Sequence, residues 1–216
     1  SPVSVELGYE LLLVDIKEQL FKPYVYSDDD GDRFLVFQIA ALEYISAQKM
    51  MPDVIHCHDH HSGLIPFMMS NCKQYNVLKE TPSVLTIHNA HYQGTMPHSK
   101  GGLLPAFDQA NIGLLDWDKS INSLAAAIKC AWRVTTVSQS YLGELMKSAN
   151  GLEALITSEA QKCLGILNGI DTKVWNPAED EYLIKNYSST SIQSGKKANK
   201  KWLCTEFGLD MSQPLI

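Results

Sequence analysis

The chain has no run of eighteen consecutive apolar residues, and its first twenty positions lack the basic start and apolar core of a secretory signal. Its 18 lysine and arginine residues stand against 24 aspartate and glutamate residues, a formal net charge of −6. Such a balance attracts phosphate backbones little, so nucleic acid is not expected as a partner, and the lack of an apolar span gives no reason to expect a membrane. The five cysteines form no C-x-x-C pair, which is typical of reduced thiols in a cytoplasmic protein.

Two glycine-containing segments resemble ligand loops but lack the residues that such loops need. In YSDDDGDRFLVF, a calcium loop with Gly31 in the sixth place would begin at Tyr26 and end at Phe37, where carboxylates are required. In HSKGGLLP, residues 98–105, no strand leads into the glycines, so a phosphate-binding loop is not predicted. We expect a solvated turn in the first segment and a surface loop in the second.

Apolar runs of strand length alternate with helical patterns along the chain. Strands are predicted at 9–14, 52–58, 82–88, 133–138 and 163–168. Helices are predicted at 32–49 with Asp32 as N-cap, at 63–75, at 120–131, at 140–148 and in the basic stretch that follows 188. This alternation predicts the α/β class, with a Rossmann-like parallel sheet flanked by helices on both faces. We expect a single domain over residues 1–216, cut from a longer protein.

Polar residues follow the predicted strands at the points where they end. In an open α/β sheet, ligands bind beyond the carboxyl ends of the strands, so these residues are expected to meet at one edge. They are Asp59, His60 and His61, then His88 and Asn89, then Ser138 and Gln139, and finally Asn168 and Gly169.

Residues 56–61 contain four histidines and invite comparison with a metal site. On a strand, His56 and His58 point the same way and could chelate zinc. However, they belong to an otherwise buried strand, and no H-E-x-x-H or paired cysteines accompany them. We expect them to be buried structural residues and expect no bound metal. The four histidines taken alone would support another hypothesis, a metal-dependent hydrolase.

Four ordered segments carry a family resemblance: PDVIHCHDHHSGLIP, LTIHNAHYQG, VTTVSQSYLGEL and GILNGIDTKVWNPAED. Together they closely resemble the N-terminal, catalytic-side domain of bacterial glycogen synthases and plant starch synthases. The resemblance implies one half of a GT-B fold, whose C-terminal nucleotide-binding domain is absent from this chain. It implies a cytoplasmic glucosyltransferase that needs no cofactor or metal. The enzyme would transfer glucose from a nucleotide glucose, normally ADP-glucose, to the non-reducing end of an α-1,4-glucan with retention of configuration.

The resemblance also assigns roles to individual residues. His88 and Asp59 match catalytic positions, with the histidine beside the donor glucose. The residues implied to bind substrate are His61, Asn89, Tyr92, Gln93 and Asn168.

One departure from the family pattern falls inside the site. Where the family reads H-D-W-H, this chain has His60 in place of the tryptophan. The family's K-T-G-G-L loop is also missing. Because the resemblance places the partners of the donor diphosphate in the absent C-terminal domain, we expect the isolated piece to be inactive. The change at His60 favours an alternative, a non-catalytic glucan-binding or regulatory relative.

Overall fold

The computed structural model describes residues 8–215. Its chain contacts divide the protein into two compact units, Ser1–Leu167 and Asn168–Ile216, which we describe separately. Among the described residues, no helix is both long and apolar enough to cross a bilayer.

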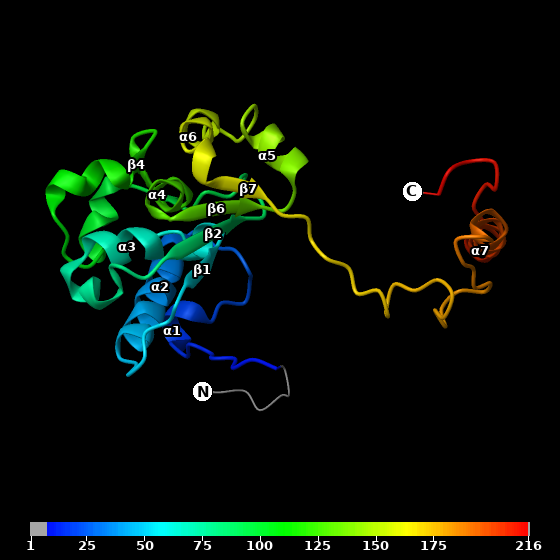
Figure 1. Ribbon diagram of the computed structural model, residues 1–216, viewed down its shortest axis with the longest axis horizontal. Helices are drawn as coiled ribbons and strands as arrows, with labels where there is room; N and C mark the ends of the chain where they lie inside the picture. The colour runs from blue at the N-terminus through cyan, green and yellow to red at the C-terminus, as the bar shows by residue number, and fades with distance from the viewer. Residues whose placement is uncertain (1–7, 216) are drawn as a thin grey trace. The chain divides into compact units, whose positions relative to one another are not determined.

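A parallel four-stranded sheet forms the centre of the first unit (Figure 1). Its order is β1-β2-β6-β7, with bounds Ile55–His58, Ser83–Ile87, Arg133–Thr136 and Cys163–Gly165. All four strands were predicted from the sequence, although each is shorter than predicted. The α/β class and the Rossmann-like parallel sheet flanked by helices are confirmed, but the expected cover on both faces is wrong for the first unit, where the face that carries His56 and His58 is exposed.

Helices and 3-10 turns make up most of the remaining structure of this unit. The α-helices are α1 Lys17–Leu20, α2 Asp30–Ser46, α3 Ile65–Asn71, α4 Ser123–Cys130, α5 Gln139–Leu145 and α6 Glu153–Ser158. The 3-10 helices are η1 His60–Ser62, η2 Lys73–Leu78, η3 His98–Leu103, η4 Gln109–Leu114 and η5 Ala160–Lys162. Residues Ser123 to Ile128 of α4 are all buried, and α4 packs against α3 in the core of the unit.

A second, antiparallel sheet explains why the predicted helix at 120–131 begins three residues late. Its order is β3-β5-β4, with bounds Thr95–Met96, Ser120–Asn122 and Asp116–Trp117. Asn122 ends β5, and its side chain accepts a hydrogen bond from the N–H of Ala125 at 2.9 Å. An asparagine that caps the first turn in this way starts a helix, so 120–122 are free to pair as a strand.

Two predictions in the N-terminal third and one at residues 98–103 are wrong. Residues 9–14 form no strand, and only Leu12 occupies an isolated bridge position. Helix α2 has Asp29 rather than Asp32 at its N-cap, and Asp32 lies in its first turn. There the Asp32 carboxylate pairs with Lys100 of η3 at 2.8 Å, so the HSKGG segment is a 3-10 helix anchored to α2 and not a free loop.

The two faces of the main sheet differ more than the sequence predicts. Cys57 is 1% exposed on the face that meets the core, whereas His56 and His58 of the same strand are exposed on the other. The expectation that both histidines are buried is wrong, because the helices of the first unit leave this face of β1 open. Alternate residues of a strand point to opposite faces, and here only one face is covered.

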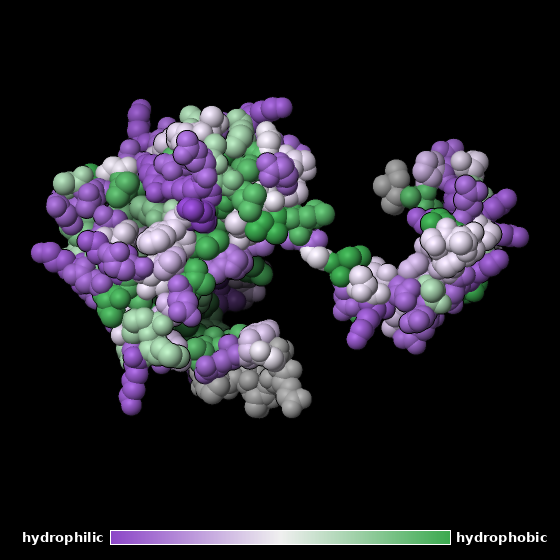
Figure 2. Space-filling model, in the orientation of Figure 1, coloured by the Kyte–Doolittle hydropathy of each residue, from purple (hydrophilic) through white to green (hydrophobic). Residues whose placement is uncertain are grey.

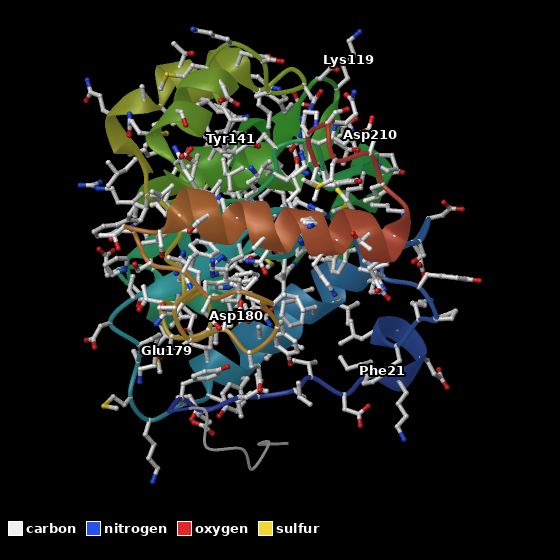
Figure 3. All side chains as sticks on the ribbon, turned by 90° about the vertical axis from the view of Figure 1, so that its right-hand side faces the viewer. Phe21, Lys119, Tyr141, Glu179, Asp180 and Asp210 are labelled. Carbon is white, nitrogen blue, oxygen red and sulfur yellow. The ribbon has the colours of Figure 1, made fainter. Side chains whose placement is uncertain are left out.

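The second unit contains helix α7, Ile192–Phe207, which ends at Gly208 in the left-handed region (φ 62°). Gly195 lies on its inner side, where an added Cβ would come within 2.3 Å of Tyr187. Glu179 and Asp180 lie in the turns that precede this helix (Figure 3). The helix was predicted, and its aromatic residues Trp202 and Phe207 are exposed.

Candidate functional site

Asp59 connects the carboxyl ends of β1 and β2. Its carboxylate Oδ1 accepts hydrogen bonds from the backbone N–H of His88 at 2.8 Å and of Asn89 at 3.3 Å. Its own N–H donates to the carbonyl of Thr86 at 2.9 Å. The backbone of Asp59 has φ 52° and ψ −165°, a strained conformation that persists only where its surroundings fix it. The structure thus brings Asp59, His88 and Asn89 together at one edge of the sheet.

The ring of His88 is held from β1. Its Nε2 lies 3.0 Å from Nδ1 of His58. The backbone of His58 is fixed in turn by Ser62, whose hydroxyl accepts from the His58 N–H at 2.7 Å and donates to its carbonyl at 2.9 Å. Burial lowers the pKa of His58, and the neighbouring His56 and His88 lower it further, so His58 is neutral at pH 7.

His60 is the buried histidine of the cluster, with 6% of its surface exposed. Its ring lies edge-on to Phe34 at 5.7 Å and 3.9 Å from the ring of His61. Its Nδ1 is buried and has no hydrogen-bond partner among the described residues. Burial lowers its pKa to about 4, which makes it a neutral packing residue at physiological pH.

Gly94 explains how the ring of His60 fits. Gly94 has φ 63°, and a Cβ at this position would lie 2.8 Å from Cδ2 of His60. Both its backbone conformation and its approach to the ring therefore require glycine.

His61 and Tyr92 belong to an aromatic group that also includes Tyr26 and Phe34. The His61 ring lies 4.5 Å from Phe34 and 6.0 Å from Tyr26. Tyr92 stacks on Tyr26, with ring centroids 5.5 Å apart and an angle of 8° between planes. Both tyrosines are half exposed, so this group presents an aromatic surface beside the exits of β1 and β2.

Sequence reasoning missed three contributors to this site. Tyr26 and Phe34 lie in the segment that resembles a calcium loop without its ligands. The sequence feature that could have indicated them is that these two aromatic residues flank the acidic residues of this segment. His58 was assigned to the strand interior, and the H-x-H alternation gave no sign of which face would be open.

Gln93 is turned toward the protein. Its Oε1 accepts from Asn122 at 2.7 Å, and its Nε2 donates to the carbonyl of Asn150 at 2.9 Å. Asn89, in contrast, is exposed, and its Oδ1 accepts from the N–H of His91 at 2.9 Å. Tyr141 of α5, labelled in Figure 3, supports the same loop, because its hydroxyl accepts from the N–H of Ala90 at 3.2 Å.

The exits of β6 and β7 carry the remaining polar residues of the prediction. The hydroxyl of Ser138 accepts from the N–H of Tyr141 at 3.0 Å and caps α5. Asn168 is exposed and begins the second unit.

The site is polar but carries little positive charge. Burial lowers the pKa of His61 as well, although the carboxylates of Asp59 and Asp30 oppose this effect. Across the part of the chain that the structure describes, no group of three or more His, Cys, Asp or Glu side chains could hold a metal ion. The arrangement offers neutral imidazole, amide and phenol groups, which match the hydroxyls of a sugar.

A hollow of about 220 Å³ borders Phe34 of the aromatic group. Its lining includes Phe34, Gln38, His60, Gly94 and Ser123. His60 therefore borders a space that its neighbours do not fill. On the visible face of the first unit, hydrophilic residues lie among hydrophobic ones (Figure 2).

Comparison with known proteins gives consistent matches. A family model described as the starch synthase catalytic domain matches residues 3–158. The chain is 52% identical to a glycogen synthase of Flavobacterium johnsoniae over 214 residues, covering 99% of this chain and 45% of that protein. It is 37% identical to a glycogen synthase of Streptococcus gordonii over 217 residues, covering 97% of this chain and 45% of that protein.

A solved structure matches as well. The catalytic domain of starch synthase IV from Arabidopsis thaliana, bound to ADP and acarbose, superposes with a TM-score of 0.68 and 32% identity. The match covers 88% of this chain and 40% of that one. The chain therefore spans less than half the length of these relatives.

Proposed function

This chain belongs to the family of starch synthase catalytic domains, and from that premise we propose that it is part of a retaining glucosyltransferase. The donor is a nucleotide glucose, with ADP-glucose favoured because the matched starch synthase structure is bound to ADP. The acceptor is the non-reducing end of an α-1,4-glucan. The parent protein thereby takes part in glycogen or starch synthesis in the cytoplasm.

The main observation in support of this proposal is that Asp59, which follows β1, is hydrogen-bonded to the residues that follow β2. Its carboxylate holds the backbone of His88 and Asn89 at the carboxyl edge of a parallel sheet, the place where α/β proteins bind ligands. A retaining glucosyl transfer develops positive charge on the sugar, and fixed neutral dipoles stabilise such charge without reorganising. His58 and His61, whose pKa values burial lowers, supply neutral dipoles of that kind at this edge.

We base the roles of the residues on the family resemblance, and their contacts fit these roles. His88 faces the donor glucose, and Asp59 acts through the position that it gives to His88 and Asn89. His61 and Tyr92 form an acceptor surface with Tyr26, since aromatic faces and phenol hydroxyls suit a glucan chain. Gln93 contributes by holding the Tyr92 loop, because its amide is occupied by Asn122 and Asn150. Asn168 is assigned to the same site on the family resemblance alone.

We further propose that residues 1–216 are one half of a GT-B enzyme and do not catalyse transfer alone. The glycogen synthases that it matches are more than twice as long, and a donor diphosphate needs cationic partners that the edge described above lacks.

The test uses the full-length gene product that contains this chain. Transfer of labelled glucose from ADP-glucose to maltoheptaose is measured for the wild type and for His88→Ala. The matched control is His98→Ala, because His98 is paired with Asp116 at 2.7 Å on another part of the first unit. We expect a loss of kcat of at least about 100-fold for His88→Ala, and a change below about twofold for His98→Ala. Wild-type transfer by His88→Ala would contradict the proposal.

The second candidate, a non-catalytic glucan-binding relative, was favoured by His60 in the place of tryptophan. The structure weakens this argument, since His60 is 6% exposed and offers almost no surface to a glucan. An inactive full-length protein that still binds maltoheptaose would nevertheless establish this candidate.

A further inference from the structure

A row of polar side chains crosses the open face of the main sheet. His56 and His58 stand on β1, Thr86 on β2 and Thr135 on β6, all at positions that face away from the core. The row leads to His88, which follows β2. This face is open in the first unit, so polar side chains can occupy it without being buried.

Short contacts link the members of this row. The Thr86 hydroxyl lies 2.7 Å from that of Thr135, and either hydroxyl can donate to the other. Nε2 of His56 lies 2.7 Å from the Thr86 hydroxyl. The Thr135 hydroxyl also lies 3.4 Å from the carbonyl of Leu85. A hydroxyl can both donate and accept, so the threonine pair holds the ring of His56 in either direction of these bonds.

His56, once fixed, supports His58. Their ring centroids are 4.2 Å apart with planes at 37°, so each ring restricts the other. His58 then places Nδ1 3.0 Å from Nε2 of His88, with ring centroids 5.3 Å apart. The titratable groups that face His58 are His56, His88 and Asp59, and the first two oppose its protonation.

We propose that His58, supported by His56 and the Thr86–Thr135 pair, is a positioning residue for glucosyl transfer. Its Nδ1 forms a hydrogen bond with Nε2 of His88, so that Nδ1 of His88 is available to the ligand. Asp59 fixes the backbone of His88, and His58 fixes the ring. The inference rests on the proposed function, because it assigns the ring of His88 to the donor sugar.

Three substitutions of His58 separate the hydrogen bond from the bulk of the ring. In His58→Asn, the side-chain amide occupies nearly the position of Nδ1. In His58→Gln, it lies one bond further out, near the position of Nε2. In His58→Phe, a ring remains to stack on His56 but has no nitrogen.

The experiment measures kcat and KM for ADP-glucose in the full-length protein, with maltoheptaose as acceptor, and checks folding by thermal melting. We expect His58→Gln and His58→Phe to lose about 10- to 100-fold in kcat, with KM changed by less than about threefold, because a misaligned reacting group impairs the chemical step. We expect His58→Asn to retain at least about a third of wild-type kcat.

Four results would overturn the inference. Equal losses in all three folded variants would show that ring bulk matters rather than Nδ1, and wild-type kcat in all three would show that His58 has no role. A raised KM at unchanged kcat would assign His58 to binding alone. Unfolding of His58→Asn at the temperature where the wild type is active would show a purely structural role. If His88→Ala is inactive while the His58 series is unaffected, only this inference fails; if His88→Ala is fully active, the proposed function fails first.

Discussion

The carboxylate of Asp59 accepts a hydrogen bond from the backbone N–H of His88 across 2.8 Å, so the residue that ends β1 sets the position of the residue that follows β2. Because β1 and β2 are parallel neighbours, their carboxyl ends lie at the same edge, and one carboxylate can span both exits. Asp59 meets this requirement only in a backbone conformation, φ 52°, that few residues other than glycine adopt.

Substitution of Asp59 should separate the charge of this side chain from its geometry. Asp59→Asn keeps an oxygen acceptor and tolerates a positive φ, whereas Asp59→Ala loses the acceptor and is strained. In the full-length protein, we expect kcat for glucose transfer to fall less than about tenfold in Asp59→Asn and about 100-fold or more in Asp59→Ala. Equal losses in the two variants would show that the charge, not the hydrogen bond to His88, is what matters.

His60 should make stability depend on pH. Its folded pKa of about 4 lies below the unfolded value of 6.5. The unfolded state therefore takes up the proton first as pH falls. Stability should be unaffected above about pH 6.5, should decrease between about 6.5 and 4, and should level off below, with a total loss of up to about 3 kcal/mol.

The variant His60→Phe isolates this contribution. It removes the titrating ring and the buried Nδ1 that has no partner among the described residues. Urea denaturation of both proteins at pH 7 and pH 5 gives the free energies of unfolding. We expect the wild type to lose more stability than His60→Phe over this interval. Equal losses would mean that His60 does not contribute to the acid sensitivity.

Gly94 should tolerate no side chain. Gly94→Ala would place a Cβ 2.8 Å from Cδ2 of His60 in a backbone with φ 63°. We expect a loss of about 2–4 kcal/mol in the free energy of unfolding, from backbone strain and overpacking together. Gly113→Ala is the matched control, because nothing lies within 4 Å of its added Cβ, and it should change stability by less than about 1 kcal/mol. Similar effects of both substitutions would disprove the close packing of Gly94 on His60.

The parallel sheet could be predicted from the sequence because its signal is local. Each strand is a short apolar run, and the residue that follows it is polar, so both the strands and their exits can be recognised without knowing the fold. The strand ends were less predictable. Asn122 reads as part of a helix in sequence, and its role as a cap emerges only once β5 pairs with β3 and β4.

The histidines show where sequence reasoning about the site reached its limit. The alternation of Ile55, His56, Cys57 and His58 reveals two faces of a strand but not which is covered. That depends on helices distant in sequence, so His56 and His58 were expected to be buried, and they are exposed. His60 was expected to alter a sugar-binding surface, and it is instead buried under Phe34 and Gly94.

A crystal structure of the full-length protein with ADP-glucose and a maltooligosaccharide would test the central claim most directly. The account predicts that the glucosyl ring binds at the carboxyl edge of β1 and β2, within about 3.2 Å of His88, while Nε2 of His88 stays on His58. A glucosyl ring bound elsewhere, with His88 and Asp59 free of contact to it, would contradict the account.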